Sequence, residues 1–289
     1  MADTRRYIVL GAAGQLGRDL CTRLGGTVIP LTRAELELTA PPEALRAALA
    51  ERRPDVVINC AAYNFVDKAE DEPGPAFAVN ALAPRRLAEA CRELGAVFVH
   101  FSTDYVFGLD ANRQTPYRES DAPGPLSVYG ASKLAGEYLV RSAGPRHFVI
   151  RTCGLYGRWG SGGKGGNFVE TMLRVAGQGK PLRVVADQVL TPSYTADVAE
   201  AAVRLIQGEQ YGLYHLTNAG HCSWYEFART IFELAGVSAD LTPTTSAEYG
   251  SRARRPAYSV LASEHPHTPP LRPWRAALAA YLEERRQTW

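Results

Sequence analysis

Short apolar runs alternate with longer amphipathic stretches along the first half of the chain. Runs of β-branched and aromatic residues predict strands, and apolar residues at helical spacing predict helices between them. The predicted strands are 7–10, 27–31, 55–60, 97–102 and 147–151, and the predicted helices are 15–24, 42–51, 76–94 and 128–142. The run Val56-Val57-Ile58 is apolar at every position, which suits a strand covered by helices on both faces. This half therefore predicts an α/β fold built on a doubly wound parallel sheet.

The alternation breaks after residue 151, where six glycines between Gly157 and Gly166 predict an irregular loop. A helix at 196–206 and a strand at 212–216 look like late additions to the first sheet, and two amphipathic helices follow at 224–235 and 274–286. We therefore expect one domain from 1–152 with about 194–217. A smaller, discontinuous α/β domain is expected from about 153–193 with 218–289.

Composition narrows the class of partner. The chain has 289 residues and a formal net charge of +2, which indicates neither nucleic acid nor an anionic membrane as a partner. No run of eighteen apolar residues predicts a membrane span. The five cysteines form no Cys-x-x-Cys pair, and none of the six histidines has ligand-like spacing to another. We expect a cytoplasmic protein that acts on a small molecule and has no metal site.

A glycine-rich turn follows the first predicted strand and opens the first predicted helix. Its string contains Gly11, Gly14, Gln15, Leu16 and Gly17. Glycines allow close backbone approach, and the helix N-terminus offers unpaired N–H groups to a pyrophosphate. The first domain is therefore predicted to be a Rossmann-type dinucleotide-binding domain, with the smaller domain binding the substrate.

The choice of dinucleotide depends on the end of the second strand, where an acid would bind the ribose 2′-OH and an arginine the 2′-phosphate. That end reads Leu31-Thr32-Arg33, with no carboxylate before Glu35. We therefore expect NADP(H) to be preferred, with NAD(H) as the alternative. The competing interpretation of Arg33 is a solvated loop charge.

Tyr129 and Lys133 are four residues apart on one predicted helix, so they share a face. A neighbouring ammonium favours the phenolate, and we expect it to lower the pKa of Tyr129 from the ordinary ~10. Ser102, Thr103 and Asp104 follow the strand at 97–102, at the carboxyl edge where open α/β sheets place their chemistry. This pattern predicts proton transfer to a carbonyl oxygen.

The glycine loop, Thr103 and the Tyr129-to-Lys133 string together resemble the extended short-chain dehydrogenases/reductases. Further strings narrow the resemblance to the dTDP-4-dehydrorhamnose reductase family, whose members reduce a 4-keto-6-deoxy nucleotide sugar with NAD(P)H. These strings are 14–17, 61–63, 66–70, 102–107, 129–137, 166–169 and 214–218.

The resemblance implies a role for each matching residue. Tyr129 would protonate the C4 oxygen, Lys133 would tune Tyr129 and hold the nicotinamide ribose, and Thr103 would bind the substrate oxygen. Asp104 and Ser102 would orient the site, and Ser102 would also contact the cofactor. Three residues would line the cofactor: Ala61, Ala62 and Asn80. The residues that would face the nucleotide and diphosphate of the substrate are Asn167, Phe168, Arg254 and Arg255. Alternatives stay open: Asp104 as a turn former, Asn80 as a packing residue, and the two arginines as a solvated pair.

One position departs from the family. Gly154 stands where the reductases usually carry a tryptophan that packs on the sugar. Either the sugar is placed differently, Tyr156 or Trp159 takes over, or the substrate is another nucleotide sugar.

Two other functions share this fold. A nucleotide-sugar epimerase would keep the Tyr and the Lys. An NADP-binding partner subunit, like the methionine adenosyltransferase β subunit, would keep the fold without turnover. A homodimer is also left open.

Overall fold

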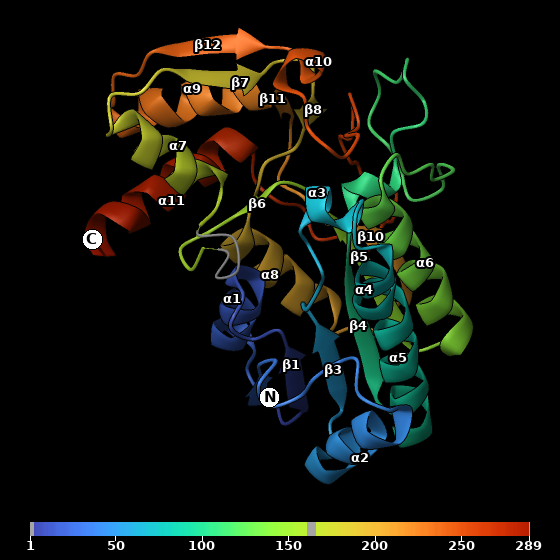
Figure 1. The fold of residues 1–289 in the computed structure, drawn as a ribbon. Coiled ribbons are helices and arrows are strands. Elements are labelled where there is room, and N and C mark those ends of the chain that lie inside the picture. The colour runs from blue at the N-terminus through green and yellow to red at the C-terminus, as the bar shows by residue number, and fades with distance from the viewer. Residues whose placement is uncertain (1–2, 161–165, 289) are drawn as a thin grey trace.

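Six parallel strands form the central sheet of the protein, in the order β10-β5-β4-β3-β1-β2 (Figure 1). The computed structural model describes residues 3–160 and 166–288. The strands are β1 (Arg6–Leu10), β2 (Thr27–Leu31), β3 (Val56–Asn59), β4 (Val97–Thr103), β5 (His147–Thr152) and β10 (Gly212–His215). Every residue of β3 and β4 is buried, because helices cover both faces of the sheet. The predicted doubly wound parallel sheet is confirmed.

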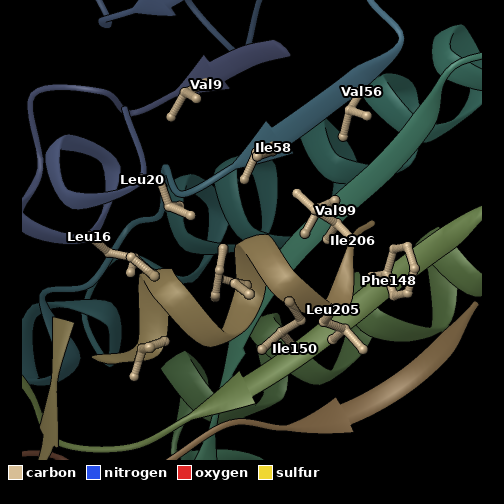
Figure 2. Close-up of a cluster of buried hydrophobic side chains, with 14 of the residues drawn as sticks. Val9, Leu16, Leu20, Val56, Ile58, Val99, Phe148, Ile150, Leu205 and Ile206 are labelled. Atoms are coloured by element: carbon tan, nitrogen blue, oxygen red, sulfur yellow. The ribbon is translucent and has the colours of Figure 1, made fainter. Parts of the chain in front are cut away.

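Helices form a layer on each face of this sheet. One layer contains α1 (Gln15–Arg23) and α8 (Thr195–Leu205), and the other contains α2 (Pro42–Arg52), α5 (Ala83–Leu94) and α6 (Val128–Ala143). Figure 2 shows the core of the first layer, where Leu16 and Leu20 of α1 meet side chains of β1, β3, β4 and β5. Alternate strand residues point to the two layers, so Val9 joins the first core while Ile8 joins the second.

The strand order changes direction between β1 and β3. From β1 the chain adds β2 on one side, then crosses to add β3, β4, β5 and β10 on the other. In open α/β sheets such a switch point opens a crevice at the carboxyl ends of the two strands. The glycine turn after β1 and the Ala61-Ala62 turn after β3 both lie at this point. The fold thus places two of the predicted cofactor segments next to each other.

A second group of elements forms a smaller lobe beyond the carboxyl edge of the sheet (Figure 1). Its core is closed by β7 (Leu182–Val185), β12 (Leu241–Thr244), α7 (Phe168–Ala176), α9 (Trp224–Ala235) and α11 (Trp274–Thr288). Short strand pairs complete it: β6 (Leu155–Tyr156) with β9 (Ser193–Tyr194), and β8 (Val189–Leu190) with β11 (Cys222–Ser223). The turn α10 (Ser246–Tyr249) follows β12. We propose that these two groups of elements are the two predicted domains, with the boundaries given above.

The predicted helix at 76–94 is wrong in one respect, because the structure divides it. It consists of α4 (Pro73–Phe77), the π-helical turn η1 (Ala78–Leu82) and α5. Pro84 has no N–H to donate to the carbonyl of Asn80, four residues earlier, so the regular ladder is interrupted there. In the first half of the chain, two short elements were not predicted, α3 (Val66–Ala69) and the 3₁₀ turn η2 (Asp104–Val106). In the smaller lobe, the elements that were not predicted are α7, α10, β6, β7, β8, β9, β11 and β12. Of the predicted glycine-rich loop, residues 161–165 lie outside the described residues.

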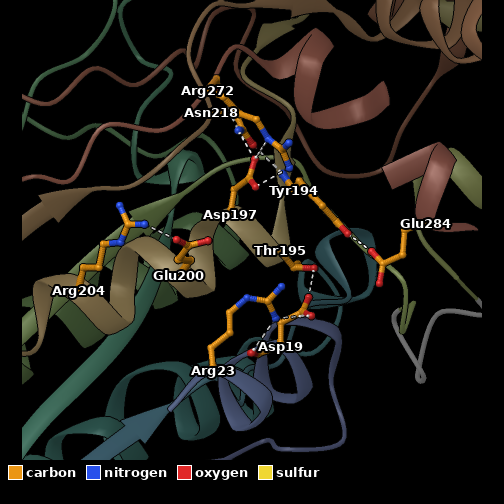
Figure 3. A network of polar contacts seen from close by, with 10 residues as sticks. All are labelled: Asp19, Arg23, Tyr194, Thr195, Asp197, Glu200, Arg204, Asn218, Arg272 and Glu284. Atoms are coloured by element: carbon orange, nitrogen blue, oxygen red, sulfur yellow. Dashed lines mark hydrogen bonds and ion pairs between the residues drawn. The ribbon is translucent and has the colours of Figure 1, made fainter. Parts of the chain in front are cut away.

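Polar contacts join α1 and α8 to the smaller lobe (Figure 3). The hydroxyl of Thr195, at the start of α8, donates to the buried carboxylate of Asp19 on α1. Asp197 accepts two hydrogen bonds from Arg272, both at 2.8 Å, and one from Asn218 at 2.8 Å. Because Arg272 lies in the segment leading into α11, these bonds fix the C-terminal helix relative to the sheet.

Leu20→Ala tests the first core layer. Leu20 is fully buried between α1 and the sheet, so its loss should destabilise the protein by about 2–5 kcal/mol. Leu109→Ala is the matched control, because Leu109 is 67% exposed and should cost less than about 0.5 kcal/mol. Urea unfolding followed by circular dichroism measures both; equal midpoints for the two variants would contradict this description of the core.

Candidate active site

Two glycines shape the turn after β1. Gly11 has a φ of +73°, and a Cβ there would lie 2.8 Å from the backbone nitrogen of Ala61. A Cβ on Gly17 would lie 2.4 Å from the carbonyl oxygen of Gly11. A side chain at either position would therefore collide with backbone, which explains why the close packing of β1, α1 and the β3 turn requires glycine.

The N-terminus of α1 presents its N–H groups without competition from side chains. Gly14 is the N-cap and makes no side-chain cap bond, and the first turn holds no acidic residue. Gln15 donates from Nε2 to the Leu155 carbonyl at 3.2 Å, and Leu16 is buried in the first core. Their side chains are thus held within the protein, so any contact of Gln15 and Leu16 with a phosphate would come from the backbone.

Arg33 lies just beyond β2, at the outer end of the same crevice. Its side chain is 88% exposed and pairs with Glu37, four residues along the chain, at 2.7 Å. An exposed pair of this kind contributes little free energy, because water screens both charges. This exposure matches the solvated loop charge, and the contact of Arg33 with a 2′-phosphate stays a prediction.

Asn80 supports the wall formed by the turn after β3. Its Oδ1 accepts from the Tyr63 N–H at 2.8 Å, and its Nδ2 donates to the Tyr63 carbonyl at 2.9 Å and to Ser132 at 3.0 Å. The amide is buried and fully used within the protein. Ala61 and Ala62, just before Tyr63, are partly exposed at this wall. The contacts of Asn80 match the packing interpretation, and its direct contact with the cofactor stays a prediction.

Thr103 ends β4 and connects two groups of the site. Its hydroxyl donates to Asp104 Oδ1 at 3.0 Å, and Thr103 lies close enough to the Tyr129 phenol to lower the pKa of that group. Asp104 is buried and accepts from the Cys153 thiol at 3.0 Å. Burial raises the pKa of the Asp104 carboxyl, and the neighbouring Ser259, Cys153 and Thr103 side chains oppose the shift. The structure thus brings Thr103, Asp104 and Tyr129 together, and their roles stay predictions.

The expected effect of Lys133 on Tyr129 is wrong in this structure. Burial is the largest influence and raises the pKa of Tyr129 to about 12; the Thr103 hydrogen bond lowers it and the Asp104 charge raises it. Although the two side chains share a face of α6, the Lys133 amine is directed to the Phe101 carbonyl, at 2.6 Å. Burial therefore decides the pKa of Tyr129, and Lys133 is not among the groups that shift it.

A buried ion pair behind Lys133 was not predicted. Glu137, one turn after Lys133 on α6, pairs with Arg151 of β5 at 2.7 Å and accepts from the Ser102 hydroxyl. Arg151 also lies over the Phe107 ring at 4.9 Å. The Ser102 hydroxyl is thus committed to this support, and its cofactor contact stays a prediction. The available signal was the spacing of Tyr129, Lys133 and Glu137 at every fourth position.

Arg255 is engaged within the protein. Its guanidinium binds Asp67 of α3 through two bonds, at 3.0 and 2.7 Å, and lies beside Tyr105. This changes one expectation, because Arg255 has a protein carboxylate as its partner where a diphosphate was expected. Arg254 beside it is exposed, and its predicted contact with the substrate stays a prediction.

Asn167 and Phe168 begin α7. Asn167 caps the helix by accepting from Glu170 N–H at 3.0 Å and donates to the Gly157 carbonyl at 2.8 Å. The Phe168 ring packs against Trp224, with centroids 4.6 Å apart. Both side chains thus stabilise the smaller lobe, and their contact with substrate remains a prediction.

The two aromatic residues expected to replace the missing tryptophan at position 154 are both packed against other groups of the protein. Gly154 has a φ of +53°, and a Cβ there would lie 2.9 Å from Leu190 Cδ1, so this backbone does not accommodate a larger residue. Tyr156 is fully buried in the smaller lobe. Trp159 lies between Arg18 and Arg158, at 5.1 and 4.8 Å, on the α1 side of the crevice.

Two further observations concern metal binding and membrane-spanning helices. Over residues 3–160 and 166–288, no three His, Cys, Asp or Glu side chains gather in a way that could hold a metal ion. Within the same residues, no helix has the length and apolar character needed to cross a membrane.

Comparisons with known proteins agree on one family. A family model described as the RmlD substrate binding domain matches residues 5–287. The spore coat polysaccharide biosynthesis protein SpsK of Bacillus subtilis is 42% identical, over 97% of this chain and 98% of that relative. The dTDP-4-dehydrorhamnose reductase of Mycolicibacterium smegmatis is 43% identical, over 95% of this chain and 84% of its own. A solved dTDP-4-dehydrorhamnose reductase from Bacillus anthracis, in complex with NADP, is 36% identical with a TM-score of 0.91, over 98% of this chain and 100% of that one.

Gly17→Ala tests the glycine turn. The added methyl group would force the Gly11 carbonyl away, so we expect dinucleotide affinity to fall at least ~10-fold, a loss of about 1.4 kcal/mol. Gly74→Ala is the control, because a Cβ there meets nothing within 4 Å. Calorimetric titration with NADP measures affinity, and thermal melting reports folding separately. Unchanged affinity in a folded Gly17→Ala protein would contradict this assignment.

Proposed function

The chain belongs to the RmlD substrate binding domain family, and we propose that Thr103, Tyr129 and Lys133 carry its chemistry. The protein is an NAD(P)-dependent oxidoreductase of the dTDP-4-dehydrorhamnose reductase type, which acts on the keto group of a nucleotide sugar. One observation carries the residue assignment: Thr103 and Tyr129 lie close enough for Thr103 to lower the pKa of the phenol, at the carboxyl end of β4 and at the same edge of the sheet as the glycine turn.

The geometry supports a division of roles. The nicotinamide, when bound, supplies the hydride. Tyr129 donates its phenolic proton to the keto oxygen as negative charge develops there, since its raised pKa keeps it protonated at neutral pH. Thr103 would donate to the same oxygen by turning its hydroxyl, which donates to Asp104 in this structure, toward the substrate. Lys133 lies one turn along α6 and would hold the ribose beside Tyr129.

The glycine turn and the N-terminus of α1 would hold the cofactor pyrophosphate, and the wall at Ala61 and Ala62 would face the nicotinamide half. We propose that Arg33 selects NADP(H) by binding the 2′-phosphate. Its exposed position at the end of β2 supports this, as does the absence of a carboxylate between Leu31 and Arg33.

We propose a dTDP-linked 4-keto-6-deoxy sugar as the substrate, held without an aromatic shelf at position 154. Asn167, Phe168, Arg254 and Arg255 remain the proposed substrate side, with Arg255 acting through Asp67 and Tyr105 unless a diphosphate displaces Asp67. A cytoplasmic location and a homodimer are also part of this proposal. The five cysteines, all free thiols, are compatible with a reducing compartment.

Tyr129→Phe tests the proton donor. Removing the phenolic hydroxyl should lower kcat by ~10²–10⁴-fold while NADP still binds, because the ring and its packing on Tyr105 are retained. Tyr138→Phe on the same helix is the control, since Tyr138 is 52% exposed and has no proposed role in the reaction. NADPH oxidation with a dTDP-4-keto-6-deoxy sugar, followed by absorbance, measures both variants.

The same assay separates the competing functions. Equal rates for Tyr129→Phe and the unmodified protein would refute the assignment of Tyr129. Tight NADP binding without any turnover would favour the partner subunit. A product in which a sugar carbon is inverted while the keto group is retained would favour the epimerase.

Arg33→Ala tests cofactor choice. The loss of a charge-assisted contact of about 1.5–3 kcal/mol should lower kcat/KM for NADPH ~10–100-fold and leave kcat/KM for NADH nearly unchanged. Arg85→Ala is the matched control, because Arg85 forms an exposed pair of the same spacing with Glu89 at 2.9 Å. A parallel fall for both cofactors would show that Arg33 does not bind the 2′-phosphate.

A further inference from the structure

A chain of buried polar groups runs from the turn after β3 to Lys133. The Ala61 N–H donates to Asn59 Oδ1 at 3.1 Å, Asn59 Nδ2 lies 3.2 Å from His100 Nδ1, and His100 Nε2 lies 3.4 Å from Lys133 Nζ. Asn59 and His100 are fully buried, and Lys133 is 2% exposed. Each polar atom in this chain must find its partner within the protein, since an unpaired buried group costs about 1–3 kcal/mol.

The direction of each hydrogen bond follows from one fixed end. A backbone N–H can only donate, so the Asn59 oxygen faces Ala61 and the Asn59 NH₂ faces His100. His100 Nδ1 must then accept. A neutral imidazole has one N–H and one bare nitrogen, so the proton of His100 lies on Nε2, directed at Lys133.

A charged ammonium at Lys133 does not fit this order, because it has three N–H donors and no lone pair. It would face another donor across 3.4 Å. A neutral amine fits: its lone pair accepts from His100 Nε2, one N–H donates to the Phe101 carbonyl at 2.6 Å, and one N–H remains for a ligand.

We propose that His100 is a positioning residue that favours the neutral amine of Lys133 over the ammonium, with the lone pair on His100 Nε2, in the cofactor-free protein. The inference concerns the same Lys133 to which the proposed function gives a role, but it does not depend on turnover. His100 thereby sets the charge carried beside Tyr129.

Other groups face Lys133 from each neighbouring element. Glu137 on α6 and Cys60 after β3 favour the charged amine, whereas Arg151 of β5 is already paired with Glu137. Burial outweighs Glu137 and Cys60 and lowers the pKa of Lys133 to about 8. Burial, the largest influence, also holds the pKa of His100 well below its usual range, so His100 is neutral.

Lysine NMR on the full-length, cofactor-free protein tests the charge of Lys133. The chain has only four lysines, at positions 68, 133, 164 and 180, so ε-¹³C labelling gives few signals. Loss of one signal in Lys133→Met assigns it. We expect the Lys133 signal to titrate near pH 8, and a midpoint in the ordinary range of ~10.4 would overturn the proposal.

Two variants of His100 separate its role from burial. His100→Gln places an amide NH₂ near the former Nε2 and should keep the midpoint. His100→Asn keeps a partner for Asn59 but lacks a donor toward Lys133, so the midpoint should rise by ~1 pH unit. Equal midpoints in both variants would overturn the role of His100.

The tautomer of His100 decides the case if His100→Asn fails to fold. Long-range ¹H–¹⁵N spectra of the histidine-labelled protein, assigned by the signal missing in His100→Gln, should show a proton on Nε2. A proton on Nδ1 would overturn the proposal. Neither measurement uses substrate, so this failure is distinct from a failure of the Tyr129→Phe test.

Discussion

Burial of charged side chains is the constraint on which this active site depends. Lys133, Glu137, Arg151 and Asp104 all lie within the protein, where an isolated charge is strongly unfavourable. Each has a different solution. Glu137 and Arg151 neutralise each other, Asp104 collects three hydrogen-bond donors, and Lys133 has a carbonyl and an imidazole. The same burial that requires these partners also raises the pKa of Tyr129, which keeps its proton available.

The sheet topology connects this set of charges to the glycine turn. Because the strand order switches between β1 and β3, Gly11 comes within van der Waals contact of the Ala61 backbone. The same Ala61 donates to Asn59, which continues to His100 and Lys133. The Ala61 turn, which is proposed to face the dinucleotide, and the Lys133 amine therefore belong to one hydrogen-bonded unit. A shift of the Ala61 turn would alter the partners of Lys133 without touching it directly.

The strands and helices of the central sheet could be predicted from the sequence because each is identified by the residues within it. Strands buried on both faces are apolar at every position, as in β3, and the helices between them have their own period. The elements of the smaller lobe were harder to predict from the sequence. Its strands β6, β8, β9 and β11 have two residues each, which is too short to show an alternation of apolar and polar residues.

The active-site residues also differ in how far the local sequence identifies them. Tyr129, Thr103 and the glycines stand in recognisable local strings, but the partners of Arg255 and His100 do not. Arg255 meets a carboxylate 188 positions away, and His100 reads only as a polar residue in an apolar strand. The pKa of Tyr129 was misjudged because helix spacing gives the position of a Cβ but not the direction of a lysine amine.

The Asp67 contact also connects the smaller lobe to Tyr129, the proposed proton donor. The segment 252–255 approaches α3 through Arg252 to Asp71, through the Ala253 N–H to Asp67, and through Arg255 to Asp67. The first pair is exposed and contributes little, but the second and third share one carboxylate, and Arg255 binds it with both arms of its guanidinium. Arg255 also lies beside Tyr105, whose ring meets Tyr129 edge-on at 5.7 Å. A continuous series of packed groups, from Asp67 through Arg255 and Tyr105, therefore joins this segment to Tyr129.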